Sequence, residues 1–233
     1  MTFLHRIVDS VYELRRKVDS EETFVRGILR RHFHEGARLL DVGCGFGRFH
    51  SAIQSTGWSY TGVDLNPKTV EQGRARNREV YLAGDLQADE KFDAILLAHI
   101  IEHLDTDQLI AFLGHYLEKL RPGGIVIVLT PVMHRGFYDD FDHVKPYNPE
   151  ALRQMLCRST QQTRPFAIPG EYREIRLWIK RDPFWHSYRS SRAHHLLSIP
   201  LTLAAVASFG LIAKTTGYGM VLRRIDNAPP VKG

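Results

Sequence analysis

The sequence predicts a doubly wound α/β fold, with helices on both faces of a mostly parallel sheet. Between residues 37 and 131, short apolar segments typical of strands alternate with longer segments of helical periodicity. Glycines punctuate this alternation, in the turn after the first apolar segment, at Gly57 where the first helix is expected to end, and in a later Pro-Gly-Gly break. Alternation of this kind is typical of a sheet whose strands are joined by crossing helices.

The expected strands in this region are ARLLDVG, SYTGVDL, EVYLAGDL, KFDAILLAHI and GGIVIVLTP. The expected helices are GRFHSAIQSTG, NPKTVEQGRARN with Pro67 near its first turn, and DTDQLIAFLGHYLEKLRPGG. After them, NPEALRQMLCRS is expected to be a helix, and REIRLWIKRD and TGYGMVLRRID are expected to be strands. The predicted sheet therefore has seven strands.

Residues 1–36 are expected to form amphipathic helices ahead of the α/β domain, which is expected to take up residues 37–233. FLHRIVDSVYELRRK has apolar residues at roughly helical spacing, and SEETFVRGILRRHF begins with Ser20, a residue type that caps helix N-termini.

Composition indicates a globular protein. The chain has 233 residues, of which 43% are hydrophobic and 24% are charged, enough for a substantial core. No long apolar segment follows the basic residues near the N-terminus, so no secretory signal is expected. Cys44 and Cys157 do not make a disulfide framework or a paired metal motif, which favours the cytoplasm.

Charge is distributed unevenly along the chain. Residues 153–233 carry 13 Lys and Arg against 4 Asp and Glu, while the whole chain has a net charge of +5. A basic C-terminal third favours attraction to a polyanion, either nucleic acid or an anionic membrane surface. A solvated basic face is the alternative interpretation.

The turn in LLDVGCGFGRF carries the strongest functional signal. Its glycines, Gly43, Gly45 and Gly47, would let a ligand approach the backbone closely, next to the free N–H groups of a helix N-terminus. A dinucleotide-binding fingerprint would require a glycine where Arg48 stands. The glycines follow the pattern G-x-G-x-G instead, after the acidic residue Asp41.

Five segments, in order, resemble the motifs of class I S-adenosylmethionine-dependent methyltransferases. They are LDVGCGFG, GVDLNP, GDL, FDAILLAHIIEHL and LRPGGIVIVLTP. The resemblance covers roughly residues 37–131 and implies a Rossmann-like sheet of seven strands whose last strand is antiparallel. It also implies S-adenosyl-L-methionine as cofactor and S-adenosyl-L-homocysteine as product.

The same resemblance implies roles for individual residues. The glycine loop, with Asp41, would border the methionine part of the cofactor. Asp64 would accept hydrogen bonds from both ribose hydroxyls, which suits a carboxylate, and Leu65 would lie against the adenine. Asp85 would receive the adenine amino group, with Leu86 beside the ring.

His99 is the first candidate for lining the point where cofactor and acceptor meet, because it follows the fourth predicted strand. We expect it to contact the cofactor and to act as a catalytic residue, with Glu102 and His103 behind it. The alternative is that these residues only begin a helix, since many relatives carry a similar Glu-His-Leu without using it for proton transfer.

His143 is the second candidate base. It lies in FYDDFDHVKPYNPEAL, which resembles a loop of a bacterial branch of the family that overhangs the active site. Asp142 or Tyr147 would orient its ring. The alternative is that His143 and Lys145 only hold the loop against the body of the protein.

Metal binding is not expected. Ubiquinone-type O-methyltransferases resemble the stretch AHIIEHL, and some bind a divalent ion through an acidic cluster that ends in Glu-His. Here His99 stands at the upstream acidic position, which departs from that pattern.

Leu196–Ala213 is an uncharged run of 18 residues, close to the length of a bilayer span. A single span would separate the last strand from its own sheet. We therefore expect residues 183–214 to be an insertion between the last two strands, forming a lid over the acceptor pocket or a shallow membrane contact.

The predicted function is methyl transfer from S-adenosylmethionine to a small, apolar or lipid-linked acceptor, most simply on oxygen. The expected location is the cytoplasm, with peripheral contact at the inner membrane surface. An RNA methyltransferase is the first alternative, favoured by the basic C-terminal third, although no RNA-binding module is recognised. A noncatalytic cofactor-binding scaffold is the second.

Overall fold

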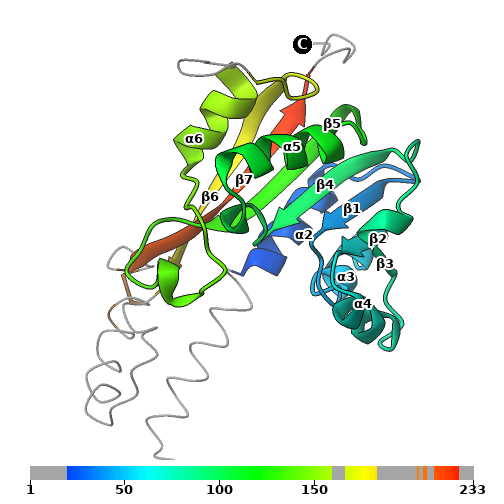
Figure 1. Cartoon of the computed structure of the whole chain (residues 1–233), viewed down its shortest axis with the longest axis horizontal. Helices are drawn as coiled ribbons and strands as arrows, with labels where there is room; N and C mark the ends of the chain where they lie inside the picture. Colours follow the sequence, from blue (N-terminus) through cyan, green and yellow to red (C-terminus); the bar gives the residue numbers. More distant parts are fainter. Residues whose placement is uncertain (1–19, 159–165, 183–203, 205–206, 209–212, 226–233) are drawn as a thin grey trace, which may run out of the picture.

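The computed structural model describes residues 20–158, 166–182, 204, 207–208 and 213–225. A seven-stranded sheet runs through the molecule in the order β3-β2-β1-β4-β5-β7-β6 (Figure 1). Strands β1 to β5 are parallel, and β7 is antiparallel to both of its neighbours. The predicted fold, including the antiparallel last strand, is confirmed. The strands are β1 (Arg38–Val42), β2 (Ser59–Asp64), β3 (Val80–Leu82), β4 (Phe92–Ala98), β5 (Leu120–Pro131), β6 (Tyr172–Asp182) and β7 (Lys214–Arg224).

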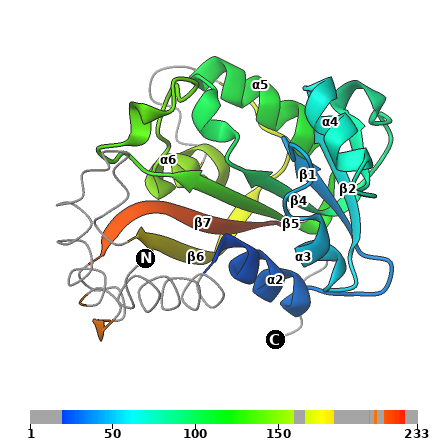
Figure 2. The same cartoon turned by 90° about the horizontal axis from the view of Figure 1, so that it is seen from below.

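Helices cover both faces of this sheet. They are α2 (Glu21–Arg31), α3 (His50–Gln54), α4 (Pro67–Arg74), α5 (Thr106–Leu117) and α6 (Pro149–Arg153). Short helical turns occupy Ala83–Asp85, Ile101–His103, Phe137–Asp139 and Gln154–Arg158. Figure 2 shows α2 and α5 on opposite sides of the strands.

Two apolar cores correspond to the two faces. On one face, α2 and α3 bury Val25, Leu29 and Ile53 against the sheet. On the other, α5 and α6 bury residues such as Leu113 and Leu152. Each helix presents one apolar stripe, as its spacing predicts, and the sheet is therefore buried on both sides.

Helix boundaries differ from the expected ones, most clearly in two places. The helix expected to begin at Gly47 begins only at His50, because Gly47 has a φ of +78° and the chain is still turning there. α5 ends at Leu117, and the Pro-Gly-Gly segment belongs to β5 instead of closing the helix. The N-cap expected at Ser20 is confirmed, since its side chain accepts a hydrogen bond from the N–H of Thr23.

Five strands end at one edge of the sheet, and β6 ends there too. β7 is antiparallel to β5, and β6 is antiparallel to β7, so β6 runs in the direction of β1 to β5. The segment between β6 and β7 therefore begins at the carboxyl edge, where open α/β sheets bind their ligands.

Residues 183–212 lie outside the described part of the chain, apart from 204 and 207–208, so the lid or membrane role expected of residues 183–214 stays a prediction. The same holds for the helix expected before Ser20. Within the described ranges, none of the helices combines the length and the apolar character that crossing a bilayer needs.

Candidate functional site

The glycine loop connects β1 to α3 at the carboxyl edge. Gly43, Gly45 and Gly47 all have positive φ, at +67°, +57° and +78°. A Cβ at Gly43 would meet the side chain of Ile100, and because φ is positive there, any other residue would be strained. The loop thus brings bare backbone to the ends of β1 and β2.

Asp64 ends β2 and is fixed by this loop. The N–H of Gly45 donates to its Oδ2 at 2.8 Å, and the N–H of Asn66 donates to Oδ1 at 2.8 Å. The hydroxyl of Thr69 faces both Oδ1 and the carbonyl of Asn66. Since a carboxylate offers about four acceptor positions, Asp64 keeps room for further donors while its orientation is set by backbone groups.

The residues expected around the adenine follow from neighbouring strands. Leu65, directly after Asp64, is 86% exposed, so its side chain is accessible to a ligand. β3 lies beside β2 with Leu82 in register with Asp64, and Asp85 and Leu86 follow the turn after β3. This geometry fits the nucleoside part of S-adenosylmethionine, although the individual contacts remain predictions.

Asp41 lies beneath the loop and is only 1% exposed. Its carboxylate accepts a hydrogen bond from the hydroxyl of Tyr60 at 2.8 Å. Burial raises the pKa of Asp41 to about 7, although the hydrogen bond from Tyr60 opposes this shift. In this position Asp41 supports the loop from below, and a direct contact with the cofactor stays a prediction.

His99 follows β4 in a left-handed conformation, with a φ of +55°. Its Nε2–H donates to Glu21 at 2.9 Å and its Nδ1–H donates to Glu102 at 3.2 Å. Burial by itself lowers the pKa of His99, but the hydrogen bonds to Glu102 and Glu21 outweigh it and raise the pKa to about 9. At neutral pH the ring therefore holds both protons, which does not suit the proton acceptor that the sequence suggested.

Glu21 is the site residue that the sequence analysis missed. It is the first residue of α2 and only 5% exposed, yet its carboxylate has three cationic partners. Besides His99, these are Arg48 just after the glycine loop and Lys180 on β6, each with a nitrogen 2.8 Å from a carboxylate oxygen. Next to Ser20, an acidic residue is expected merely to complement the helix dipole, so no local pattern indicates these contacts.

Glu102 connects the end of β4 to the loop after β5. Its side chain is fully buried and accepts a hydrogen bond from Thr130 at 3.0 Å in addition to the one from His99. Its backbone carbonyl accepts from the N–H groups of Val144 and Lys145. Glu102 is therefore a structural link between the fourth predicted motif and the loop that carries His143.

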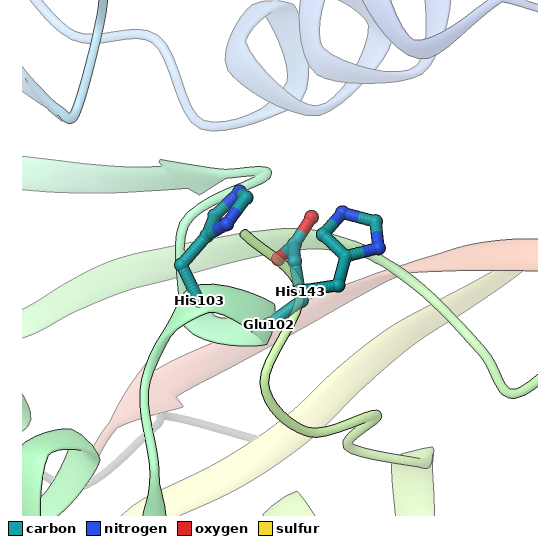
Figure 3. Close-up of side chains that lie close together, drawn as sticks. All are labelled: Glu102, His103 and His143. Carbon is teal, nitrogen blue, oxygen red and sulfur yellow. The ribbon is translucent and has the colours of Figure 1, made fainter. Parts of the chain in front are cut away.

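His103 and His143 lie on either side of this link (Figure 3). The Nδ1–H of His103 donates to the carbonyl of Asp142 at 3.0 Å, and that of His143 donates to the carbonyl of Phe137 at 2.6 Å. These bonds leave each Nε2 as an acceptor. The orienting partner of His143 is thus the Phe137 carbonyl.

The two orienting partners expected for His143 are wrong. The hydroxyl of Tyr147 donates to the carbonyl of Leu104, and Asp142 meets His103 through its backbone. Lys145 makes a contact of the kind expected if it holds the loop against the body of the protein, because its Nζ donates to the hydroxyl of Thr106 at 2.8 Å.

Glu102, His103 and His143 each have one potential ligand atom within 4.8 Å of the others. Two of the acceptor positions of Glu102 are taken by hydrogen bonds from His99 and Thr130. The hydrogen bonds of these three residues connect the turn after β4 to the loop after β5, and we assign no metal to the group. The expectation that this site binds no metal stays a prediction.

Known proteins match this arrangement. Residues 14–164 match a protein family described as a methyltransferase domain. Ubiquinone biosynthesis O-methyltransferase of Paramagnetospirillum magneticum is 31% identical over 123 residues, which are 44% of this chain and 49% of that protein. The enzyme of the same name from Xanthomonas campestris is 32% identical over 155 residues, 62% of this chain and 61% of that protein. The chain thus spans about half the length of the curated relatives it matches.

Solved structures agree on the fold. A SAM-dependent methyltransferase from Archaeoglobus fulgidus superposes with a TM-score of 0.58 at 19% identity, covering 91% of this chain and 99% of its own. The match to the methyltransferase domain covers more than half of the chain and includes the glycine loop and Asp64. The chain belongs to the class I S-adenosylmethionine-dependent methyltransferases.

Proposed function

We propose that the protein transfers a methyl group from S-adenosylmethionine to an oxygen of a small, apolar or lipid-linked acceptor. The observation that carries this proposal is Asp64, held at the end of β2 by the N–H of Gly45. A carboxylate fixed in this way, beside a loop of bare backbone, has the chemistry needed to receive two ribose hydroxyls. The names of the relatives support oxygen as the receiving atom.

Cofactor binding would use Asp64 and Asp85 as acceptors, Leu65 and Leu86 as apolar neighbours of the adenine, and the glycine loop as backbone lining. When bound, S-adenosylmethionine supplies a sulfonium methyl group that is open to in-line displacement by a nucleophile. The protein then gains most by holding both reactants in line and by excluding water.

His143 is the better candidate for taking the acceptor's proton. Its Nδ1–H is committed to Phe137, so Nε2 keeps the lone pair that a base needs. Asp140 lies 3.8 Å from that Nε2 and would stabilise the ring once it is protonated. His99, held between two carboxylates, would instead line the acceptor side as a cation.

The loop after β5 supports an apolar acceptor. Its exposed side chains include Met133, Tyr138, Val144 and Phe141, and the last of these is 92% exposed. An exposed group of large apolar side chains on one loop is typical of a surface that contacts apolar ligands or a membrane. We extend the proposal to a peripheral membrane contact, to which residues 183–214 would add.

The test uses S-adenosylmethionine labelled on its methyl group, purified protein and fractionated cell extract. At a low concentration of S-adenosylmethionine, label should enter the lipid or small-molecule fraction with the wild type and much more slowly with Asp64→Asn, whose amide group replaces one acceptor oxygen. Calorimetry with S-adenosylhomocysteine separates binding from turnover. Label in the RNA fraction would overturn the acceptor class, and binding without label in any fraction would favour the scaffold.

A further inference from the structure

We propose that Glu21 is a positioning residue of the methyl-transfer site, whose carboxylate holds the His99 ring in place as a cation at the end of β4. This inference rests on the proposed function, because it gives His99 a task at the acceptor side. Glu21 itself comes from α2, outside the segments that resemble the family motifs.

The partners of Glu21 point to a task other than holding α2 in the fold. Its carboxylate meets His99, Arg48 and Lys180, which come from three different parts of the chain. α2 already docks through apolar side chains such as Val25 and Leu29, which are fully buried. Buried ionic groups add little stability compared with apolar residues of similar size, so three cations around one buried carboxylate indicate a functional arrangement.

The backbone of His99 is fixed independently of its ring. Its N–H donates to the carbonyl of Leu129 at 2.8 Å, and its φ of +55° is uncommon for a residue with a side chain. Strained backbone of this kind persists where the surroundings enforce it, and it gathers at functional sites. Glu21 and Glu102 each accept a hydrogen bond from one of the two ring nitrogens, so these bonds restrict rotation of the ring.

The charges that face His99 come from every side. Glu21 is contributed by α2 and Glu102 by the turn after β4, while Arg48 and Lys180 share the carboxylate of Glu21. The hydroxyl of Thr130 donates to the other oxygen of Glu102, and burial together with the charge of Glu102 raises the pKa of Tyr218. Without Glu21, the imidazole would keep one carboxylate partner and face two uncompensated cations, which disfavours its protonated form.

A cation at this position has a chemical use. About 35% of the His99 side chain is exposed, at the edge of the sheet where the acceptor is expected. A fixed positive charge there would stabilise the negative charge that develops on an acceptor oxygen as its proton leaves. It would not remove that proton, which leaves this step to another group.

The first test measures the titration of the His99 ring by NMR with ¹⁵N-labelled histidine, assigned with His99→Gln. Glu21→Gln should lower the midpoint by about one pH unit or more, because it removes an opposite charge in direct contact. Glu22→Gln is the matched control, since it removes a charge from the same helical turn without touching the network, and should leave the midpoint unchanged. Equal midpoints in the two variants would overturn the proposal.

A second variant moves the same midpoint in the opposite direction. Lys180→Gln removes a cation that competes for Glu21, so the His99 midpoint should rise. A Lys180→Gln midpoint that does not rise would also count against the proposal, and this arm stays informative if Glu21→Gln folds poorly.

The functional readout is the rate of methyl transfer, measured with the extract fraction that accepts label from the wild-type protein. Glu21→Gln should lose kcat at alkaline pH, above its lowered His99 midpoint, and keep more of it toward neutral pH, Glu21→Asp should restore part of the loss, and KM for S-adenosylmethionine should change little. A uniform loss at all pH values would refute the positioning role. The proposed function fails separately, if the wild type neither binds S-adenosylhomocysteine nor transfers label.

Discussion

Asp41 offers a sharp test of the electrostatics beneath the glycine loop. Its carboxyl group is buried under the loop and its pKa is raised from 3.8 to about 7, mainly by burial. Asp41→Asn replaces it with a group of the same shape that never ionises and whose oxygen can still accept from Tyr60. The variant therefore removes the charge and keeps the packing.

The sign and the size follow from proton linkage. Between pH 4 and pH 7 the folded chain holds a proton on Asp41 that the unfolded chain has lost, so the free energy of unfolding of the wild type falls as pH rises. From pH 5 to pH 8 the loss attributable to Asp41 is about 2–3 kcal/mol. Asp41→Asn should not show this loss. The free energy of unfolding of the variant, relative to that of the wild type, should therefore be about 2–3 kcal/mol higher at pH 8 than at pH 5.

Urea denaturation without cofactor, at several pH values between 5 and 8, measures both curves. The difference between the two free energies of unfolding should change steadily over this range and level off above pH 7. If the two curves run parallel, Asp41 has an ordinary pKa in the folded protein and the explanation through burial is wrong.

Three further predictions concern the loop, the ribose contact and the base. Gly43→Ala should lower the free energy of unfolding by about 1–3 kcal/mol in urea denaturation, because its Cβ meets Ile100 at a positive φ; unchanged stability would contradict this. Asp64→Asn should weaken S-adenosylhomocysteine binding in calorimetry by about 10-fold to 100-fold, through loss of an acceptor oxygen, and equal affinity would argue against the ribose contact. His143→Ala should reduce kcat by about 100-fold or more, whereas His115→Ala, a change at an exposed histidine, should not. Full turnover of His143→Ala across pH would exclude His143 as the base.

The fold could be predicted because its signals are local. Alternating periodicity marks the strands and helices of residues 37–131, and a run of glycines marks the loop between β1 and α3. Boundaries were less accurate where two local signals compete. The Pro-Gly-Gly segment is typical of a helix stop, but Leu120 before it and Ile125 after it both pair with β4, so it becomes an irregular part of β5.

The ionic contacts around His99 and Glu21 could not be predicted, because they join residues far apart in the chain. Glu21 meets His99 at a separation of 78 positions and Lys180 at a separation of 159. His99 was identified as a site residue by its place after β4, but its chemistry depends on carboxylates that the motif does not contain. With Glu102 alone as neighbour, the ring would have kept a free nitrogen and matched the expected base.

The approach of α2 to the sheet explains how Glu21 reaches His99. Phe24, one turn along the helix, stacks on Trp178 of β6 with ring centroids 5.3 Å apart. Gly219 of β7 is the strand neighbour of Trp178 and lies against the same Phe24 ring, with which any Cβ at that position would collide. Glycine weakens a strand interior, so its presence opposite Trp178 indicates that close approach of the helix matters here. Since this apolar contact docks α2 without help from Glu21, changing the carboxylate should alter the charge on His99 and leave the helix in place.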